Sequence, residues 1–153
     1  MRLAFGLDVG ATKIAAARLD TATGEVVAAR RLGTAPERGP DAVLADCRAL
    51  AAELGSGLPA GLAVCELVDP QGRVRSAETI DWRGVDLLAD FAVVESDVRA
   101  GALAEARFGA GREHPDFLYV TVSSGISHCL ISDGVPRVGV RGAAIGTGAP
   151  LVE

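Results

Sequence analysis

Residues 5–13 read Phe-Gly-Leu-Asp-Val-Gly-Ala-Thr-Lys, and this stretch limits the possible folds more than any other part of the chain. An apolar strand ends at Asp8, a tight turn follows over Gly10 and Thr12, and a second apolar run begins directly after Lys13. Glycine lacks a Cβ and tolerates positive φ, so Gly10 would let backbone N–H groups approach phosphate oxygens. Asp8 suits Mg²⁺ through a retained water, Thr12 can hydrogen-bond a phosphate, and Lys13 adds positive charge. The alternative is a plain hairpin in which Asp and Gly are ordinary turn residues.

Two common phosphate-binding loops do not fit this spacing. The chain contains no G-x-x-x-x-G-K-[ST] sequence, which a Walker A loop requires. A Rossmann fingerprint leads into a helix, whereas a strand pattern follows this turn. The stretch therefore predicts a strand–turn–strand site for the phosphates of a nucleotide with Mg²⁺.

Composition predicts a soluble α/β protein. Of the 153 residues, 49% are hydrophobic and 23% are charged, which is typical of a globular domain with a real core. The net charge of −5 argues against a nucleic-acid-binding surface, and no apolar run approaches the roughly 20 residues that span a bilayer. The cysteines Cys47, Cys65 and Cys129 are widely spaced and lack metal-site spacing, so we expect reduced thiols in a cytoplasmic protein.

The order of elements suggests two related domains, of which the second has only begun. Three strand patterns form an antiparallel meander, an amphipathic helix follows, and two further strands lead to a second helix. A similar meander then starts again, so we predict a domain over residues 1–115 and the incomplete start of another over 116–153. The expected strands are 2–8, 13–20, 25–32, 62–68, 92–95, 117–122, 126–132 and 136–140, with a short return strand at 74–77. The expected helices are 40–54 and 97–108, with a short helix at 85–91.

The start of the helix at 97–108 carries a candidate general base. Ser96 can cap this helix, and Asp97 lies in its first turn, where the helix dipole and free N–H groups keep a carboxylate ionised. Phosphoryl transfer to a hydroxyl needs positioning and charge neutralisation more than strong basicity, so such a carboxylate suffices. The sequence alone favours Ser96-Asp97 as an ordinary helix start over a catalytic site.

With these motifs placed, the chain resembles the ROK family (repressor, open reading frame, kinase) over nearly its whole length. Residues 7–13 are similar to the family's first phosphate motif, and residues 95–106 are similar to its catalytic Glu-Asn-Asp stretch and the helix that follows. Residues 108–111 continue this match, and residues 123–127 lie where the second phosphate motif would fall.

The resemblance implies an α/β fold of the ribonuclease H-like actin/hexokinase type, with a five-stranded mixed sheet flanked by helices and the first hairpin of a second similar domain. It implies an ATP- and Mg²⁺-dependent kinase that phosphorylates a hydroxyl of a sugar or cyclitol. In that scheme Asp97 is the catalytic base and Asp8 holds the metal. The implied nucleotide-binding residues are Asp8, Gly10, Thr12, Lys13, Ser124 and Gly125, and the implied substrate residues are Ser96, Asp81 and Glu66.

Several positions depart from the family pattern. Ser96 replaces the Asn before the catalytic Asp, and Glu66 stands where the family has Gly, either as a new substrate contact or as a surface residue. Trp82 either lines the substrate loop beside Asp81 or anchors that loop on the core. Residues 143–147 lack the Glu and His that contact sugar in the family. The alternative function is therefore a catalytically silent sugar-binding or regulatory module without a DNA-binding domain. Expected partners are a second copy of the chain or a missing C-terminal half.

Overall fold

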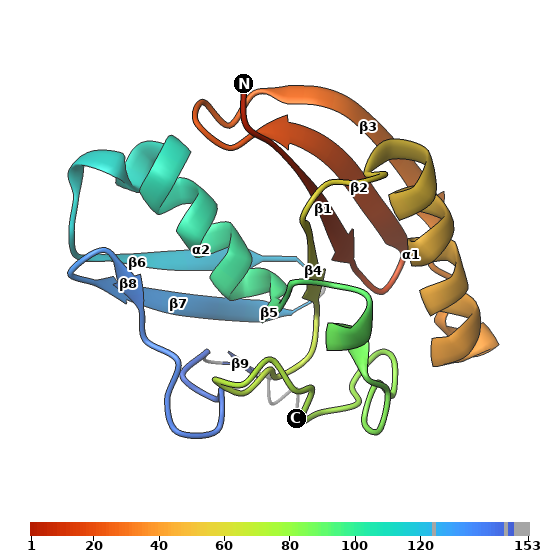
Figure 1. Cartoon of the computed structure of the whole chain (residues 1–153). Coiled ribbons are helices and arrows are strands. Elements are labelled where there is room, and N and C mark those ends of the chain that lie inside the picture. Colours follow the sequence, from red (N-terminus) through yellow and green to blue (C-terminus); the bar gives the residue numbers. More distant parts are fainter. Residues whose placement is uncertain (124, 146, 149–153) are drawn as a thin grey trace. The chain divides into compact units, whose positions relative to one another are not determined.

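The computed structural model describes residues 1–123, 125–145 and 147–148. They belong to two compact units that are divided between Asp97 and Val98, and each unit is described by itself (Figure 1).

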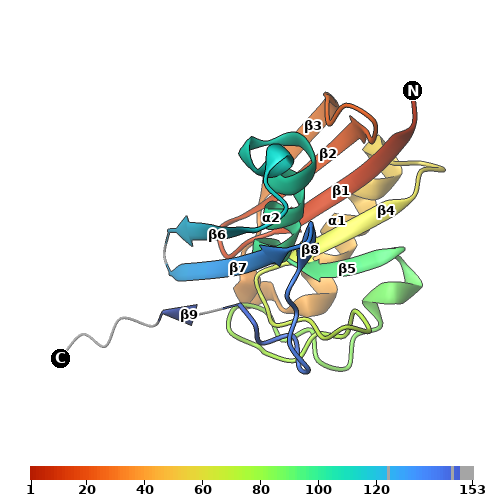
Figure 2. The same ribbon diagram turned by 90° about the vertical axis from the view of Figure 1, so that its left-hand side faces the viewer.

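The first unit contains a five-stranded mixed sheet, as predicted. Its strands are β1 (Leu3–Val9), β2 (Lys13–Asp20), β3 (Val26–Gly33), β4 (Ala60–Val64) and β5 (Val93–Ser96). The order across the sheet is β3-β2-β1-β4-β5, with β1, β2 and β3 antiparallel and β1, β4 and β5 parallel (Figure 2). The predicted antiparallel meander is therefore confirmed.

Helix α1 (Pro40–Leu54) packs on one face of this sheet. Proline fits its first turn because the missing N–H would have no intrahelical partner there. The helix ends at Leu54, and a Cβ on the following Gly55 would lie 2.6 Å from the Phe5 ring, so only glycine fits this approach. The buried side chains on the helix are Val43, Leu44, Cys47, Leu50 and Leu54, and they meet Phe5, Leu7, Val9, Ile14 and Ala16 from the sheet.

The segment between β4 and β5 is mostly irregular. The predicted strand over 62–68 ends at Val64, and the predicted return strand over 74–77 is reduced to one bridge between Val68 and Val74. Trp82 is 2% exposed and belongs to the main core, so the interpretation of Trp82 as a loop anchor is confirmed. The 3-10 helix η2 (Leu87–Ala89) follows, and another short 3-10 helix, η1 (Pro36–Arg38), precedes α1.

The second unit pairs helix α2 with a smaller sheet. Helix α2 (Asp97–Phe108) and the 3-10 helix η3 (Ala110–Glu113) precede β6 (Phe117–Val122), β7 (Ile126–Ser132), β8 (Val135–Pro136) and β9 (Thr147–Gly148). A Cβ on Gly101 of the helix would lie 2.8 Å from the Tyr119 hydroxyl, so helix and sheet are in close contact. This packing explains why the compact units divide at the start of α2, directly after its first residue. The domain boundary at residue 115 stays a prediction.

The three cysteines are free thiols. Cys47 and Cys129 are buried, and burial raises the pKa of Cys47 to about 12, so this thiol stays protonated at neutral pH. Within the described residues, no helix has the length and hydrophobicity that crossing a membrane requires.

Candidate active site

The carboxyl ends of three parallel strands meet at one edge of the first sheet. In the register of β1, β4 and β5, Val9 lies beside Val64 and Val64 beside Ser96. One residue earlier, Asp8 of β1 lies beside Ala63 of β4, and Ala63 lies beside Glu95 of β5. The backbones at Asp8 and Glu95 are therefore two strand spacings, or about 10 Å, apart. Asp97 follows Ser96 directly. The topology therefore brings Asp8 and Asp97, the predicted metal residue and base, to the same edge.

The turn between β1 and β2 is the candidate phosphate site. The Gly10 N–H donates to the Lys13 carbonyl at 2.9 Å, and Gly10 has no positive φ, so this turn does not use the left-handed conformation that glycine tolerates. The N–H groups of Ala11 and Thr12 have no acceptor among the described residues. These two donors and the exposed Thr12 side chain are the groups that could bind a phosphate.

Thr34, which the sequence analysis missed, fixes this turn from the far end of β3. Its hydroxyl donates to the Gly10 carbonyl at 2.7 Å, and its backbone N–H donates to the Thr12 carbonyl at 3.1 Å. The side chain is fully buried. No local pattern marks it, because its partners lie more than twenty residues earlier in the chain.

We expect Thr34→Val to lower the free energy of unfolding by about 1–3 kcal/mol, because the half-buried Gly10 carbonyl loses its hydroxyl donor while the side-chain volume stays similar. Urea unfolding followed by circular dichroism measures this change. Thr12→Val is the matched control, since the Thr12 side chain is exposed and no described residue bonds its hydroxyl. Equal stability of the Thr34 variant and the control would contradict this role.

Asp8 is the candidate metal ligand. Its side chain is accessible to solvent, yet the surrounding protein removes enough water to raise the pKa of its carboxyl, and the positive charge of Lys13 opposes that shift. A bound cation would favour the charged carboxylate in the same way. Among the described residues, no three His, Cys, Asp or Glu side chains cluster as a metal site. Mg²⁺ commonly takes one or two carboxylates and completes its shell with water and substrate phosphates.

Ser96 and Asp97 join β5 to α2. Ser96 is fully buried, and its hydroxyl has no hydrogen-bond partner among the described residues, so the predicted side-chain cap by Ser96 is wrong. The backbone N–H of Ser96 donates a hydrogen bond to the Glu95 carboxylate at 2.7 Å. Asp97 is the first residue of α2 and stands in the favourable field of the helix N-terminus.

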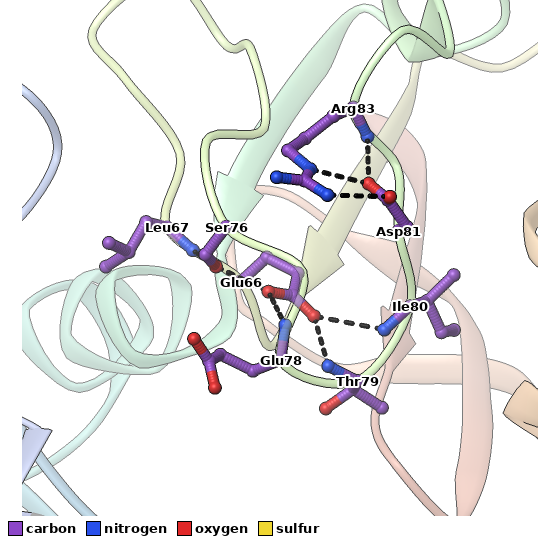
Figure 3. A network of polar contacts seen from close by, with 8 residues as sticks. All are labelled: Glu66, Leu67, Ser76, Glu78, Thr79, Ile80, Asp81 and Arg83. Atoms are coloured by element: carbon purple, nitrogen blue, oxygen red, sulfur yellow. Dashed lines mark hydrogen bonds and ion pairs between the residues drawn. The ribbon is translucent and has the colours of Figure 1, made fainter.

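The loop after β4 carries the other predicted substrate residues (Figure 3). Asp81 is exposed, and two hydrogen bonds of 2.8 Å from the Arg83 guanidinium lower the pKa of its carboxyl to about 2. Glu66 is 2% exposed, so the alternative that it is a surface residue is wrong. Both of its carboxylate oxygens accept hydrogen bonds from the loop, through the Ser76 hydroxyl and backbone N–H groups of residues 78–80.

The predicted second phosphate turn is only partly described. Ser124 lies outside the described residues. Gly125 is exposed, and its carbonyl accepts a hydrogen bond of 2.9 Å from the Ser123 N–H. Gly125 belongs to the second compact unit, and its role in binding phosphate stays a prediction.

Cys65 connects the loop to the sheet edge. Its thiol donates to the Thr79 hydroxyl at 3.3 Å. Burial is the main cause that raises the pKa of Cys65, and the negative charges of Asp97 and Glu66 add to it. Cys65 therefore lies within electrostatic reach of Asp97 on one side and contacts the loop on the other.

A model of the ROK family matches residues 4–150 of the chain. The chain belongs to the ROK family. A curated relative, the glucokinase of Streptomyces coelicolor, is 31% identical over 155 residues that cover 94% of this chain and 48% of the relative. The xylose repressor of Bacillus subtilis is 29% identical over 89 residues, which cover 54% of this chain and 23% of the repressor.

Solved structures agree with the family assignment and with the predicted fold. The ROK family glucokinase from Streptomyces griseus, in complex with glucose and AMPPNP, matches with a TM-score of 0.79 at 30% identity. The match covers 92% of this chain and 47% of that ROK glucokinase. The chain thus spans about half the length of the ROK glucokinases that it matches.

Proposed function

We propose that this protein takes part in ATP-dependent phosphorylation of a sugar or cyclitol hydroxyl. The observation that carries the proposal is the convergence of Asp8, Asp97 and the turn at 10–13 on one edge of the first sheet. That edge offers a carboxylate for a metal, unpaired backbone donors for phosphate and a second carboxylate for an acceptor hydroxyl. The glucokinases among its relatives support this reaction class.

Each residue would have a distinct part in the reaction. Asp97 would accept the proton of the attacking hydroxyl, while Asp8 would hold Mg²⁺, which neutralises charge on the transferring phosphate. The N–H groups of residues 11 and 12 and the Thr12 hydroxyl would bind phosphate oxygens, with Lys13 adding positive charge. Ser96 and Asp81 are the proposed substrate residues.

Product analysis tests the proposed reaction class. The protein is incubated with Mg·ATP and, separately, with glucose, mannose and myo-inositol, and monophosphate esters are sought by mass spectrometry. An ester that depends on Mg²⁺ supports the kinase, and its identity names the acceptor. The absence of any ester, together with saturable binding of one of these compounds, would contradict the kinase and favour the second candidate.

That second candidate is a silent sugar-binding or regulatory module. It is favoured by the sequence at 143–147, Ala-Ala-Ile-Gly-Thr, which offers no carboxylate or imidazole. The similarity to a xylose repressor supports a regulatory role as the alternative. Binding without turnover would be its signature.

One face of the second sheet points to a protein partner. On β6 and β7, Leu118 lies opposite Leu130 and Val122 lies opposite Ile126, and all four side chains are exposed. Val120, on the same face, is 50% exposed. We propose that polypeptide equivalent to the second half of the relatives covers this face, because an apolar patch of this kind is rarely left in water.

We expect the chain alone to enhance the fluorescence of an apolar dye, and the double variant Val120→Lys, Leu130→Lys to lower that signal by about half. Leu103→Lys is the control, since Leu103 is exposed on α2 instead of the sheet. Sedimentation velocity of the same samples shows whether the chain alone is a monomer or a dimer. A dimer would mean that a second copy of the chain covers this face. Equal dye signals in the double variant and the control would contradict the proposal.

A further inference from the structure

Four hydrogen-bond donors of the loop over 76–80 surround the carboxylate of the single side chain Glu66. The N–H groups of three consecutive residues converge on it, at 2.8 Å from Glu78, 2.7 Å from Thr79 and 3.1 Å from Ile80 (Figure 3). The Ser76 hydroxyl donates a fourth bond. Because the side chain is 2% exposed, water cannot replace these bonds, and hydrogen bonds to a buried carboxylate are among the stronger ones in proteins.

These hydrogen bonds tie an irregular loop to the end of β4. The segment over 76–80 makes no strand ladder, and Glu66 is one of three consecutive residues directly after β4 that hold it. The Leu67 N–H donates to the Ser76 hydroxyl at 2.9 Å, and the Cys65 thiol donates to the Thr79 hydroxyl at 3.3 Å. All three attachments come from the carboxyl end of β4, which lies between β1, the strand that carries Asp8, and β5, the strand that leads to Asp97.

The anchored loop leads directly into groups that can meet a ligand. Asp81 follows Ile80, and Trp82 anchors the chain in the core two residues after the last N–H donor. Residues 82–88 and 72–75 line a cavity of about 460 Å³. A shift of the loop would therefore move both Asp81 and one wall of this cavity.

We propose that Glu66 is a positioning residue that fixes the loop over 76–83 at the Asp97 edge of the sheet and so shapes the binding site for the acceptor sugar. The sugar-facing part of this inference rests on the proposed function. The anchoring part stands on the hydrogen bonds alone. Glu66 acts through the loop backbone and needs no contact with the substrate.

Hydrogen exchange measured by NMR on the whole chain tests the anchoring part. In Glu66→Gln, one acceptor oxygen becomes an NH₂ group facing backbone donors, so we expect the amides of residues 78–80 to exchange on the order of tenfold to hundredfold faster. Amides of α1, such as that of Leu50, should keep their protection. Glu78→Gln is the matched control, because it removes an exposed carboxylate from the same loop and leaves the backbone donor in place.

Unchanged exchange at residues 78–80 in Glu66→Gln would overturn the inference. If that variant loses protection in α1 as well, Ser76→Ala decides, since it removes the Ser76 hydroxyl with its bonds to Glu66 and the Leu67 N–H, and leaves the three backbone donors to Glu66 in place. Faster exchange confined to the loop supports anchoring, and a loop identical to wild type overturns it. Adding glucose to the wild-type protein tests the sugar-facing part. Slower exchange at 78–80 supports that part. No change with glucose, mannose or myo-inositol overturns it and leaves the anchoring result in place.

Discussion

Asp97→Asn is expected to lower kcat for phosphoryl transfer by about 10³-fold, within the range typical of removing a general base. The amide has nearly the same size as the carboxylate and still fits the first turn of α2, but it cannot accept the proton of the attacking hydroxyl. The KM values for ATP and for the sugar should change little, because the interaction is made chiefly in the transition state.

The kinetic measurement is a coupled assay of ADP release, made on the active protein with its partner if one is needed. Asp116→Asn is a suitable control, because it makes the same chemical change at an exposed position in the second unit. Residual activity of Asp97→Asn within tenfold of wild type would exclude Asp97 as the base. A large rise in the sugar KM with unchanged kcat would instead assign Asp97 to substrate binding.

Trp82→Ala is expected to lower the free energy of unfolding by about 3–5 kcal/mol, as large aromatic deletions in cores do. Trp82 is 2% exposed and packs within the main core together with Ile80, Leu87 and Phe91. Since typical domains are stable by only 5–15 kcal/mol, this loss would leave the first unit close to unfolding at room temperature.

Urea unfolding followed by far-ultraviolet circular dichroism measures the effect. Trp82→Phe keeps most of the apolar volume and should lose clearly less stability than Trp82→Ala. Phe108→Ala is a second reference, because that aromatic side chain is 38% exposed. If Trp82→Ala is no less stable than Phe108→Ala, Trp82 does not anchor the loop on the core.

The elements that the sequence predicts well are those whose signals are local. The apolar run before Asp8, the small residues of the turn and the second apolar run behind Lys13 predict β1 and β2 without help from distant residues. The spacing of Val43, Leu44, Cys47 and Leu50 predicts α1 in the same way, and Pro40 and Gly55 mark its ends. The meeting of Asp8 and Asp97 at one edge follows from the parallel strands, because the carboxyl ends of parallel strands lie at the same edge of a sheet.

The details that were missed depend on contacts between distant residues. Thr34 supports the phosphate turn from the end of β3, and nothing in its own neighbourhood indicates that contact. Glu66 binds donors that come ten or more residues later, and the lost return strand at 74–77 belongs to the same irregular loop. For Ser96 a local signal was misleading. Serine is strongly preferred as a helix cap, but here the side chain is buried at the end of β5 and makes no capping bond.

The most direct test of the proposed site is a calorimetric titration of the 153-residue chain with Mg·ATP, compared with Asp8→Ala and with Asp97→Asn. We predict saturable, Mg²⁺-dependent binding to the wild-type chain, loss of that binding in Asp8→Ala, and nearly unchanged affinity in Asp97→Asn. Equal affinity of Asp8→Ala and wild type, or no Mg²⁺-dependent binding to the wild-type chain, would contradict a nucleotide-phosphate site at this edge of the sheet.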